Sequence, residues 1–158
     1  MKLTNFFSNL WIITNLENNN IDAEFFLSYI SKVKIQHNIN KIINFDKEFK
    51  FWNSNISNIF ENTISTQMIL DNQKKCLNLY KKISILILNS LLNNNQILLV
   101  SCSKNECLIG FILYFICKKG NIELDKAFNT LNSKLDCLDK FILNTNIKKI
   151  LISECYPK

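Results

Sequence analysis

The sequence predicts an α/β domain in which helices flank a central, mostly parallel sheet. Residues 97–100 form an uninterrupted apolar run, Ile-Leu-Leu-Val, which is the pattern of a strand buried on both faces. Short β-branched runs alternate along the chain with segments whose apolar residues recur at helical spacing. The 158 residues suffice for one such domain with a substantial core, so we predict a single domain over residues 1–158.

The first half of the chain opens with a strand that is followed by a helix. Residues 10–14 are apolar and β-branched, which favours a strand, and residues 21–33 carry apolar side chains at helical spacing. A second strand is predicted over residues 39–45, a short third one over residues 50–52, and an extended segment over residues 64–70.

A long helix is predicted after this extended segment. Its apolar residues recur at helical spacing between Leu77 and Leu91, and either Asp71 or Asn72 is expected to be its N-cap. The apolar strand over residues 97–100 comes next.

A polar stretch over residues 101–106 separates that strand from a very apolar helix over residues 108–118, which we expect Gly120 to cap. A strand, a short loop and a buried helix in this order present backbone N–H groups to an anion. Two further helices are predicted near residues 123–132 and over residues 135–146.

The composition narrows the class of protein. With two glycines and one proline, the turns must be made by asparagine, which tolerates the left-handed conformation better than other residues. The net charge is +6, but the lysines are dispersed, so an acidic partner is favoured weakly and nucleic-acid binding is not predicted. The longest apolar run is shorter than the roughly 18 to 20 residues of a membrane span, so no membrane span is predicted.

The cysteines and the histidine predict neither a metal site nor a cofactor. The six cysteines include no Cys-x-x-Cys pair, and His37, which we interpret as a surface residue, is the one histidine. Cysteines within apolar runs and an N-terminus without a cleavable signal favour reduced thiols in the cytoplasm. The bias of the composition towards Asn, Ile and Lys is compatible with a viral source. In that case the protein would be located in the host cytoplasm or in the virion.

Residues 97–119 and 122–131 resemble the signature region of the dual-specificity protein phosphatases. In that family an apolar strand leads into His-Cys-x-x-Gly-x-Ser-Arg-Ser, then a buried helix, then a Leu-x-x-Ala-Phe helix. Leu124, Ala127 and Phe128 repeat the last motif in register. The resemblance covers most of the chain, is most specific between residues 96 and 131, and implies the α/β fold of these phosphatases.

Carried over by position, the resemblance places the nucleophile of the family on Cys102. It places the general acid on Asp71, because 102 − 71 = 31 positions separate the two and the family spacing is about thirty. We interpret both residues as vestigial. A buried thiol at a strand end and a helix N-cap are the simpler roles for Cys102 and Asp71.

The rest of the phosphate loop departs from the family pattern. The variable positions hold Ser103, Lys104 and Glu106. The histidine, glycine, serine, arginine and final hydroxyl residue of the family are replaced by Ser101, Asn105, Cys107, Leu108 and Ile109.

The loss of the arginine at Leu108 has the largest consequence. A guanidinium clamps two phosphate oxygens as charge moves onto them, and losing two charge-assisted hydrogen bonds costs roughly 3 to 6 kcal/mol. Glu106 would repel a phosphate and raise the pKa of Cys102, and Lys104 would offset only part of this because it lacks the planar fork. Asn105 is tolerated in a left-handed turn, so the loop is expected to keep its shape.

The residues suggest two further contacts, one between two cysteines and one made by the N-terminal segment. A redox pair of Cys102 and Cys107 would require the loop to bend back on itself, and we do not favour it. The apolar residues at the N-terminus pack on their own domain or exchange between the protomers of a dimer, which the resemblance to viral members of the family implies. These residues are Phe6, Phe7, Leu10 and Trp11.

The resemblance and the lost loop residues together predict a pseudophosphatase, a catalytically inactive protein that acts by binding a protein partner. The partner would be a phosphoprotein or a homologous subunit. Two alternatives stay open. The first is a slow phosphatase that uses Cys102, Asp71 and Lys104, and the second is a purely structural or dimerising protein whose former site is filled by Leu108.

Overall fold

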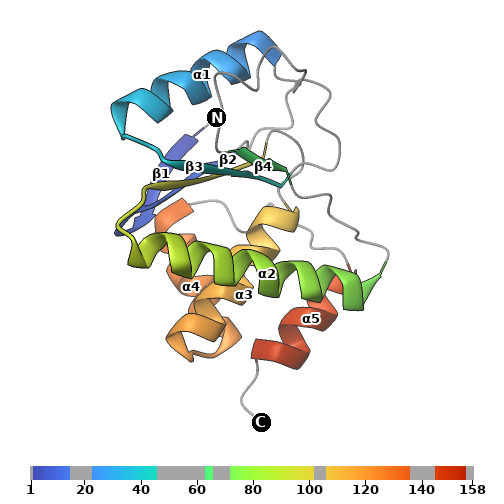
Figure 1. The fold of residues 1–158 in the computed structure, drawn as a ribbon. Helices are drawn as coiled ribbons and strands as arrows, with labels where there is room; N and C mark the ends of the chain where they lie inside the picture. Colours follow the sequence, from blue (N-terminus) through green and yellow to red (C-terminus); the bar gives the residue numbers. More distant parts are fainter. Residues whose placement is uncertain are drawn as a thin grey trace.

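The computed structural model describes residues 2–14, 23–45, 63–65, 72–101, 106–135 and 145–155. Its elements follow the chain from an N-terminal hairpin to a C-terminal helix (Figure 1). They are β1 (Lys2–Phe7), β2 (Leu10–Thr14), α1 (Ala23–Gln36), β3 (Lys41–Asn44), β4 (Thr63–Ser65), α2 (Gln73–Leu92), β5 (Ile97–Val100), α3 (Glu106–Gly120), α4 (Leu124–Leu135) and α5 (Thr145–Cys155).

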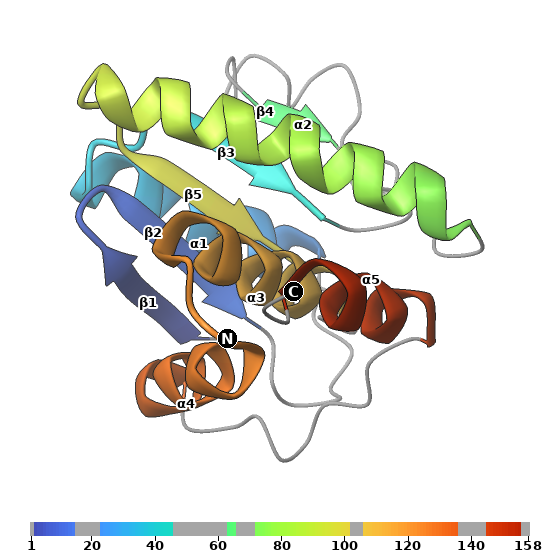
Figure 2. The same ribbon diagram turned by 90° about the horizontal axis from the view of Figure 1, so that it is seen from below.

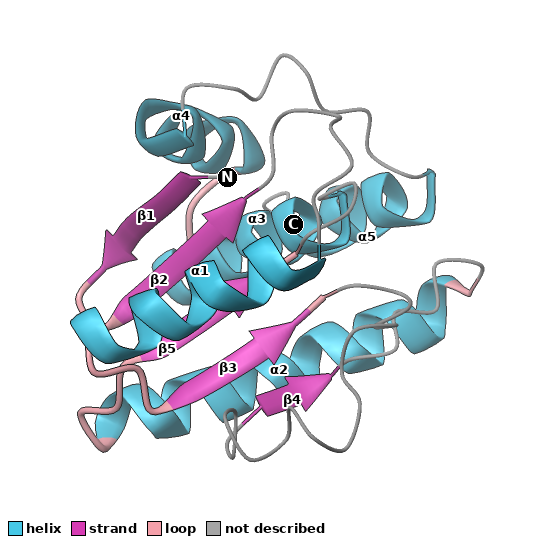
Figure 3. Ribbon diagram, turned by 90° about the horizontal axis from the view of Figure 1, so that it is seen from above, coloured by secondary structure: helices cyan, strands magenta, loops and turns pink. Residues whose placement is uncertain are grey.

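The five strands form one sheet in the order β1-β2-β5-β3-β4. β2, β5, β3 and β4 run parallel, and β1 alone is antiparallel to its neighbour β2 (Figure 3). β5 lies in the middle, and all four of its residues are buried. The prediction of a mostly parallel sheet with the strand ending at Val100 at its centre is confirmed.

Helices cover both faces of the sheet, unequally. Of the described helices, α1 lies over one face, and α2, α3, α4 and α5 gather on the other (Figures 1 and 2). Successive strand residues point to opposite faces, so Leu98 and Val100 of β5 join the cluster under α1, and Ile97 and Leu99 join the larger cluster under the other helices. β5 is therefore shared by the two halves of the core.

Asparagine makes most of the tight turns, as predicted. Of the four non-glycine residues with positive φ in the described ranges, three are asparagines, Asn38, Asn94 and Asn121, and the fourth is Ser8. The predicted role of Gly120 as a cap is wrong, because Gly120 is the last residue of α3 and the left-handed residue is Asn121. Asparagine accepts this conformation at low cost, so glycine is not needed there.

The cap of α2 distinguishes two neighbouring residues. The side-chain oxygen of Asn72 accepts a hydrogen bond from the backbone N–H of Lys75 at 3.1 Å, which makes Asn72 the N-cap. The alternative of Asp71 as the cap is therefore wrong. Asp71 itself lies outside the described residues, as do residues 50–52 and most of the helix predicted over residues 135–146.

The N-terminal segment forms an element that the pattern did not predict. β1 pairs with β2 across the turn at Ser8 and Asn9, and Phe6 is buried in the cluster that contains α3 and α4. Trp11 donates a hydrogen bond to Gln96 at 2.8 Å, and its ring lies 4.1 Å from that of His37. His37 is half-buried against this tryptophan, which corrects its interpretation as a surface residue.

The second unpredicted element is α5, which packs against α3 and α2. Gly110 of α3 marks the closest approach, since a Cβ added there would lie 2.5 Å from Cγ2 of Ile147 and 2.9 Å from the hydroxyl of Tyr80. Without a side chain at Gly110, three helices, α2, α3 and α5, can meet at this point.

Among the described residues, no helix is both long enough and apolar enough to cross a membrane.

Candidate phosphate-loop site

The candidate site begins where β5 ends, at the carboxyl edge of the parallel strands (Figure 2). β5 and β3 are held together there by the hydrogen bond from the N–H of Phe45 to the carbonyl of Val100, at 2.9 Å. Ser101 follows directly and is 2% exposed. In open α/β sheets this edge is where ligands bind, so the fold positions residues 101–106 at a suitable place.

The structure describes only part of the predicted site. Residues 102–105 lie outside the described residues, and so does residue 71, so the predictions for Cys102, Ser103, Lys104, Asn105 and Asp71 are untested. Ser101 and residues 106–109 are described. The spatial relation of nucleophile to acid therefore stays a prediction.

Leu108 is part of the hydrophobic core. It is the third residue of α3, is 0% exposed, and belongs to the large apolar cluster under the sheet. Its neighbours Cys107 and Ile109 are buried in the same cluster. The three positions that the resemblance aligns with Ser-Arg-Ser are thus occupied by buried apolar side chains.

Tyr80 of α2 contacts the first turn of α3. Its hydroxyl donates a hydrogen bond to the carbonyl oxygen of Cys107 at 3.0 Å, inside the core. Burial raises the pKa of Tyr80 well above its usual value, and the nearby Cys76, Cys107 and Glu106 raise it further. The phenol therefore stays neutral and donates.

Sequence reasoning placed Tyr80 only on the apolar face of a helix. The contact joins residues 27 positions apart, and no local pattern signals such a pairing.

Glu106 is the first residue of α3 and is half-buried. Its carboxylate lies in the turn where the helix dipole is positive, which stabilises the helix. The same end of the helix would attract the phosphate of a substrate, so Glu106 places a negative charge where a second anion would have to bind.

The sequence also contains no other residue that carries a guanidinium. All 19 basic residues among the 158 are lysines, and the chain shown contains no arginine at any position. A lysine contributes a point charge and not a planar pair of N–H donors. The absence of arginine can be read from the sequence, and it agrees with the loss of the guanidinium that Leu108 implies.

The cysteines of the described ranges are all buried thiols: Cys76, Cys107, Cys117 and Cys155. Cys102 lies outside the described residues, so the prediction against a redox pair of Cys102 and Cys107 is not tested. Within the same ranges, no group of three or more His, Cys, Asp or Glu side chains is arranged to hold a metal ion.

No protein-family model matches the chain, and no characterised protein has a significantly similar sequence. Solved structures do match over nearly the whole chain.

A phosphatase described as Cydia Pomonella PTP-2 superposes with a TM-score of 0.71 at 12% identity, covering 98% of this chain and 90% of its own. The human tyrosine phosphatase-like serine/threonine/tyrosine-interacting protein gives 0.70 at 15% identity, covering 96% and 93%. A mouse putative dual specificity phosphatase, solved with zinc tungstate, gives 0.68 at 10% identity, covering 97% and 86%.

At sequence identities this low, a structural superposition establishes a shared architecture but not a shared reaction. The superpositions cover 96% to 98% of this chain with TM-scores of 0.68 to 0.71, so the overall architecture is shared. The chain therefore has the fold of the dual-specificity and tyrosine phosphatases.

Proposed function

We propose that this protein is a pseudophosphatase, which keeps the phosphatase fold and acts by binding a protein partner. The observation that carries the proposal is the burial of Leu108 in the core at the position that aligns with the phosphate-binding arginine. A hydrocarbon side chain there cannot neutralise phosphate oxygens. With no arginine in the 158 residues, no other side chain of the chain supplies a guanidinium.

The size of the effect supports inactivity. Two charge-assisted hydrogen bonds lost in the transition state correspond to roughly 3 to 6 kcal/mol, or a rate lower by about a hundred-fold to ten-thousand-fold. Glu106, at the first position of α3, adds electrostatic repulsion. Both effects act on the same anion and in the same direction.

The similar structures support binding as the activity, although a fold alone does not specify a function. One of them is described as a phosphatase-like interacting protein, and others as phosphatases. We propose a phosphoprotein or a homologous subunit as the partner, in the cytoplasm, where the buried cysteines remain reduced. The net charge of +6 favours an acidic partner.

One observation favours the second candidate, a slow phosphatase that uses Cys102, Asp71 and Lys104. Because Asn72 is the N-cap of α2, capping does not account for the aspartate at position 71. A role as general acid would account for it.

An activity measurement separates the two candidates. The wild-type protein and Cys102→Ser are incubated with an aryl phosphate, at protein concentrations high enough to detect slow turnover. We expect equal, background rates for both. Turnover in the wild type that disappears in Cys102→Ser would establish the slow phosphatase and refute inactivity.

A binding measurement separates a working anion cradle from a purely structural role. The melting temperature is recorded with and without millimolar phosphate, sulfate or tungstate, and sodium chloride of equal ionic strength is the control. A ligand that binds the folded state raises the melting temperature. An increase would mean that the loop still binds anions, whereas no increase would mean that any partner is recognised elsewhere.

We also propose that a homodimer, if one forms, does so by exchange of the N-terminal segment. β1 and β2 are joined by a tight turn in which Ser8 has φ 47°, and short, strained hinges favour exchange. Ser8→Gly removes the strain, so we expect less dimer than in the wild type by light scattering after size exclusion. An unchanged proportion of dimer would place the contact elsewhere.

A further inference from the structure

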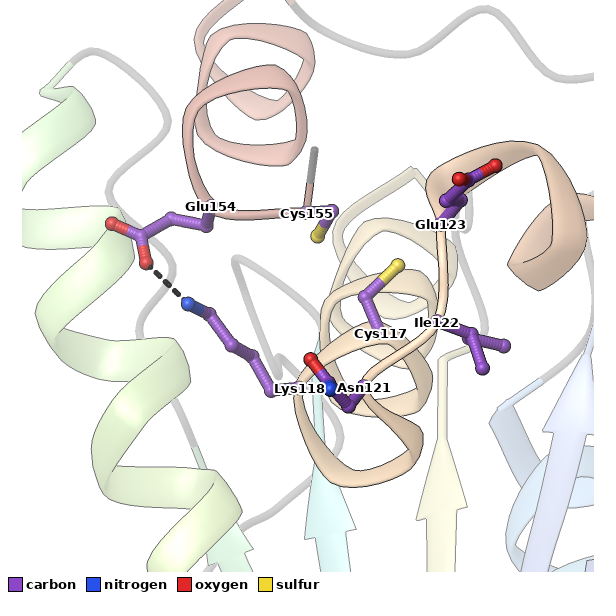
Figure 4. A pocket seen from close by; sticks show the side chains of 7 residues that line it. All are labelled: Cys117, Lys118, Asn121, Ile122, Glu123, Glu154 and Cys155. Atoms are coloured by element: carbon purple, nitrogen blue, oxygen red, sulfur yellow. Dashed lines mark ion pairs between the residues drawn. The ribbon is translucent and has the colours of Figure 1, made fainter. Parts of the chain in front are cut away.

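Two cysteines that are far apart in the sequence lie close together where α3 packs against α5. Cys117 comes from the C-terminal part of α3 and Cys155 is the last residue of α5, 155 − 117 = 38 positions later. The two thiols share a hydrogen bond. Figure 4 shows the side chains of Cys117 and Cys155 between α3 and the end of α5.

The thiols line a small pocket that reaches the surface. Its volume is about 130 Å³, and exposed residues such as Asn121 and Glu123 form part of its wall. The ion pair between Lys118 Nζ and Glu154 Oε2, at 2.8 Å, bridges the same two helices beside it (Figure 4). Cys117 and Cys155 are only 4% and 5% exposed, so a reagent must enter this pocket to reach them. The pocket admits a molecule of a few heavy atoms and is too small for a peptide thiol reagent.

The two thiols differ in acidity. The hydrogen bond from the Cys155 thiol and the charge of Lys118 lower the pKa of Cys117, against an opposing effect of burial. The same hydrogen bond, together with burial, raises the pKa of Cys155. One sulfur of the pair is thus the better nucleophile, and the other remains a protonated thiol beside it.

We propose that Cys117 and Cys155 form a redox-reactive pair that a small hydroperoxide oxidises to an intramolecular disulfide. The Cys117 thiolate attacks the terminal peroxide oxygen, the O–O bond breaks, and Cys117 becomes a sulfenic acid while water is released, or an alcohol from an organic peroxide. The Cys155 thiol then attacks the Cys117 sulfur and the S–O bond breaks. A second water leaves as the S–S bond forms.

The two sulfurs together lose two electrons and two protons, and the peroxide takes up both. A dithiol reductant reverses the step by thiol exchange.

The pair is separate from the candidate phosphate loop. Cys117 lies 11 positions after Glu106 on α3, which corresponds to about 16 Å along the helix axis. The disulfide would join α5 covalently to α3, on the side of α3 where Ile147 already packs closely on Gly110. Oxidation would therefore lock the C-terminal helix onto the core, whether or not Cys102 is active.

The test uses the full chain with Cys102→Ser and Cys137→Ser, because these two cysteines lie outside the described residues. The folded protein is treated with hydrogen peroxide, remaining thiols are alkylated, and intact mass and peptide maps are recorded. We expect loss of two hydrogens and one linked peptide pair, containing Cys117 and Cys155. The melting temperature is expected to rise on oxidation and to return after treatment with dithiothreitol.

Single substitutions identify the order of the steps. In Cys155→Ser, Cys117 is expected to stop at a sulfenic acid, which dimedone traps when it is added together with urea, because the pocket of the folded protein is too small to admit dimedone. In Cys117→Ser no dimedone adduct and no disulfide should form. Cys76→Ser is the matched control, because Cys76 is a buried thiol of the same core that lies on α2, and it should react as the parent does.

Three results would overturn the proposal. The first is a linked pair between other cysteines, such as Cys76 and Cys107. The second is oxidation of Cys117 to the sulfinic acid in the parent protein without a disulfide. The third is oxidation of the pair in the folded protein no faster than that of Cys76. All three are read from the parent protein, so they do not depend on the stability of a variant.

Discussion

At the scale of single residues, the proposal of an inactive protein depends on the packing of Leu108. An arginine at this position would need to reach a polar loop, whereas a leucine in the first turn of a buried helix gains stability by joining the core. The structure shows Leu108 fully buried in the core. Restoring the arginine alone would bury a charge among apolar side chains, which is costly.

Leu108→Ala should lower the free energy of unfolding by about 2 to 5 kcal/mol, because it leaves a cavity in a packed core. The matched control is Leu92→Ala, at an exposed position of α2 where the leucine is 82% exposed, and we expect a change within about 0.5 kcal/mol there. Urea unfolding followed by circular dichroism measures both. Equal effects of the two substitutions would show that Leu108 is not part of the core.

Tyr80 makes stability depend on alkaline pH. Its pKa is higher in the folded protein than the value of about 10 in the unfolded chain, so the folded state keeps a proton that the unfolded chain releases. Its contribution is fully present below pH about 10 and is lost as the pH rises towards the folded-state pKa. The free energy of unfolding should fall by about 1.4 kcal/mol per pH unit for this one proton.

Tyr80→Phe should remove this component of the slope above pH 10, and should cost about 1 kcal/mol at neutral pH through the lost hydrogen bond to Cys107. The difference between wild type and variant isolates Tyr80, since burial also raises the pKa of Tyr114 and of Cys76. An identical slope in Tyr80→Phe would contradict the assignment.

At the scale of elements, α3 is the central helix of the layer that α2, α3, α4 and α5 form on one face of the sheet. It packs against α4, α5 and α2, and nearly all of its residues from Cys107 to Cys117 are buried. A helix that is apolar on all sides is stable in water only when other elements surround it. Gly110 lets two of these neighbours approach closely.

Gly110→Ala should destabilise the protein by about 1 to 3 kcal/mol, because the new methyl group would lie 2.5 Å from Ile147 Cγ2. Gly120→Ala is the control on the same helix. Its methyl group would meet Ile122 at 3.6 Å, an ordinary contact, and alanine favours a helix, so we expect a neutral or slightly stabilising effect.

A double variant tests the cause of the destabilisation. Combining Gly110→Ala with Ile147→Ala should cost less than the sum of the two single effects, because the smaller side chain makes room for the methyl group. Additive effects would mean that the two helices adjust without the predicted clash.

At the scale of the whole molecule, the sheet separates two apolar clusters that meet in β5. Leu98 belongs to the cluster under α1, and Leu99 to the cluster under α2 to α5. Since one strand supplies both clusters, neither layer can lose its packing alone. That residues 1–158 form a single domain stays a prediction.

Leu98→Ala and Leu99→Ala should each lower the free energy of unfolding by about 2 to 5 kcal/mol, although they face opposite layers. Thermal unfolding should remain one transition in both variants, with coincident curves from circular dichroism and tryptophan fluorescence. Two transitions in either variant would show that the layers are independent units and would refute the single domain.

Much of the fold was predictable because it is encoded locally. Residues 10–14 are strand β2 as predicted, and the run Ile97–Val100 is a buried central strand, because period and β-branching act within a few residues. β1 and α5 were missed. β1 is stabilised by pairing with β2, and α5 by packing on α3, and neither partner can be read from the segment itself.

For the candidate site, the sequence by itself determined the residue types: a leucine aligned with the arginine of the phosphatases, a glutamate at the start of the helix, and no arginine among 158 residues. Only the tertiary structure decided what those residue types do. It shows Leu108 inside the core, gives the cap of α2 to Asn72, and brings Cys117 to Cys155 across 38 positions. The physical reason is that propensity and spacing act over one or two turns of chain, whereas burial and contacts between helices depend on how distant segments pack.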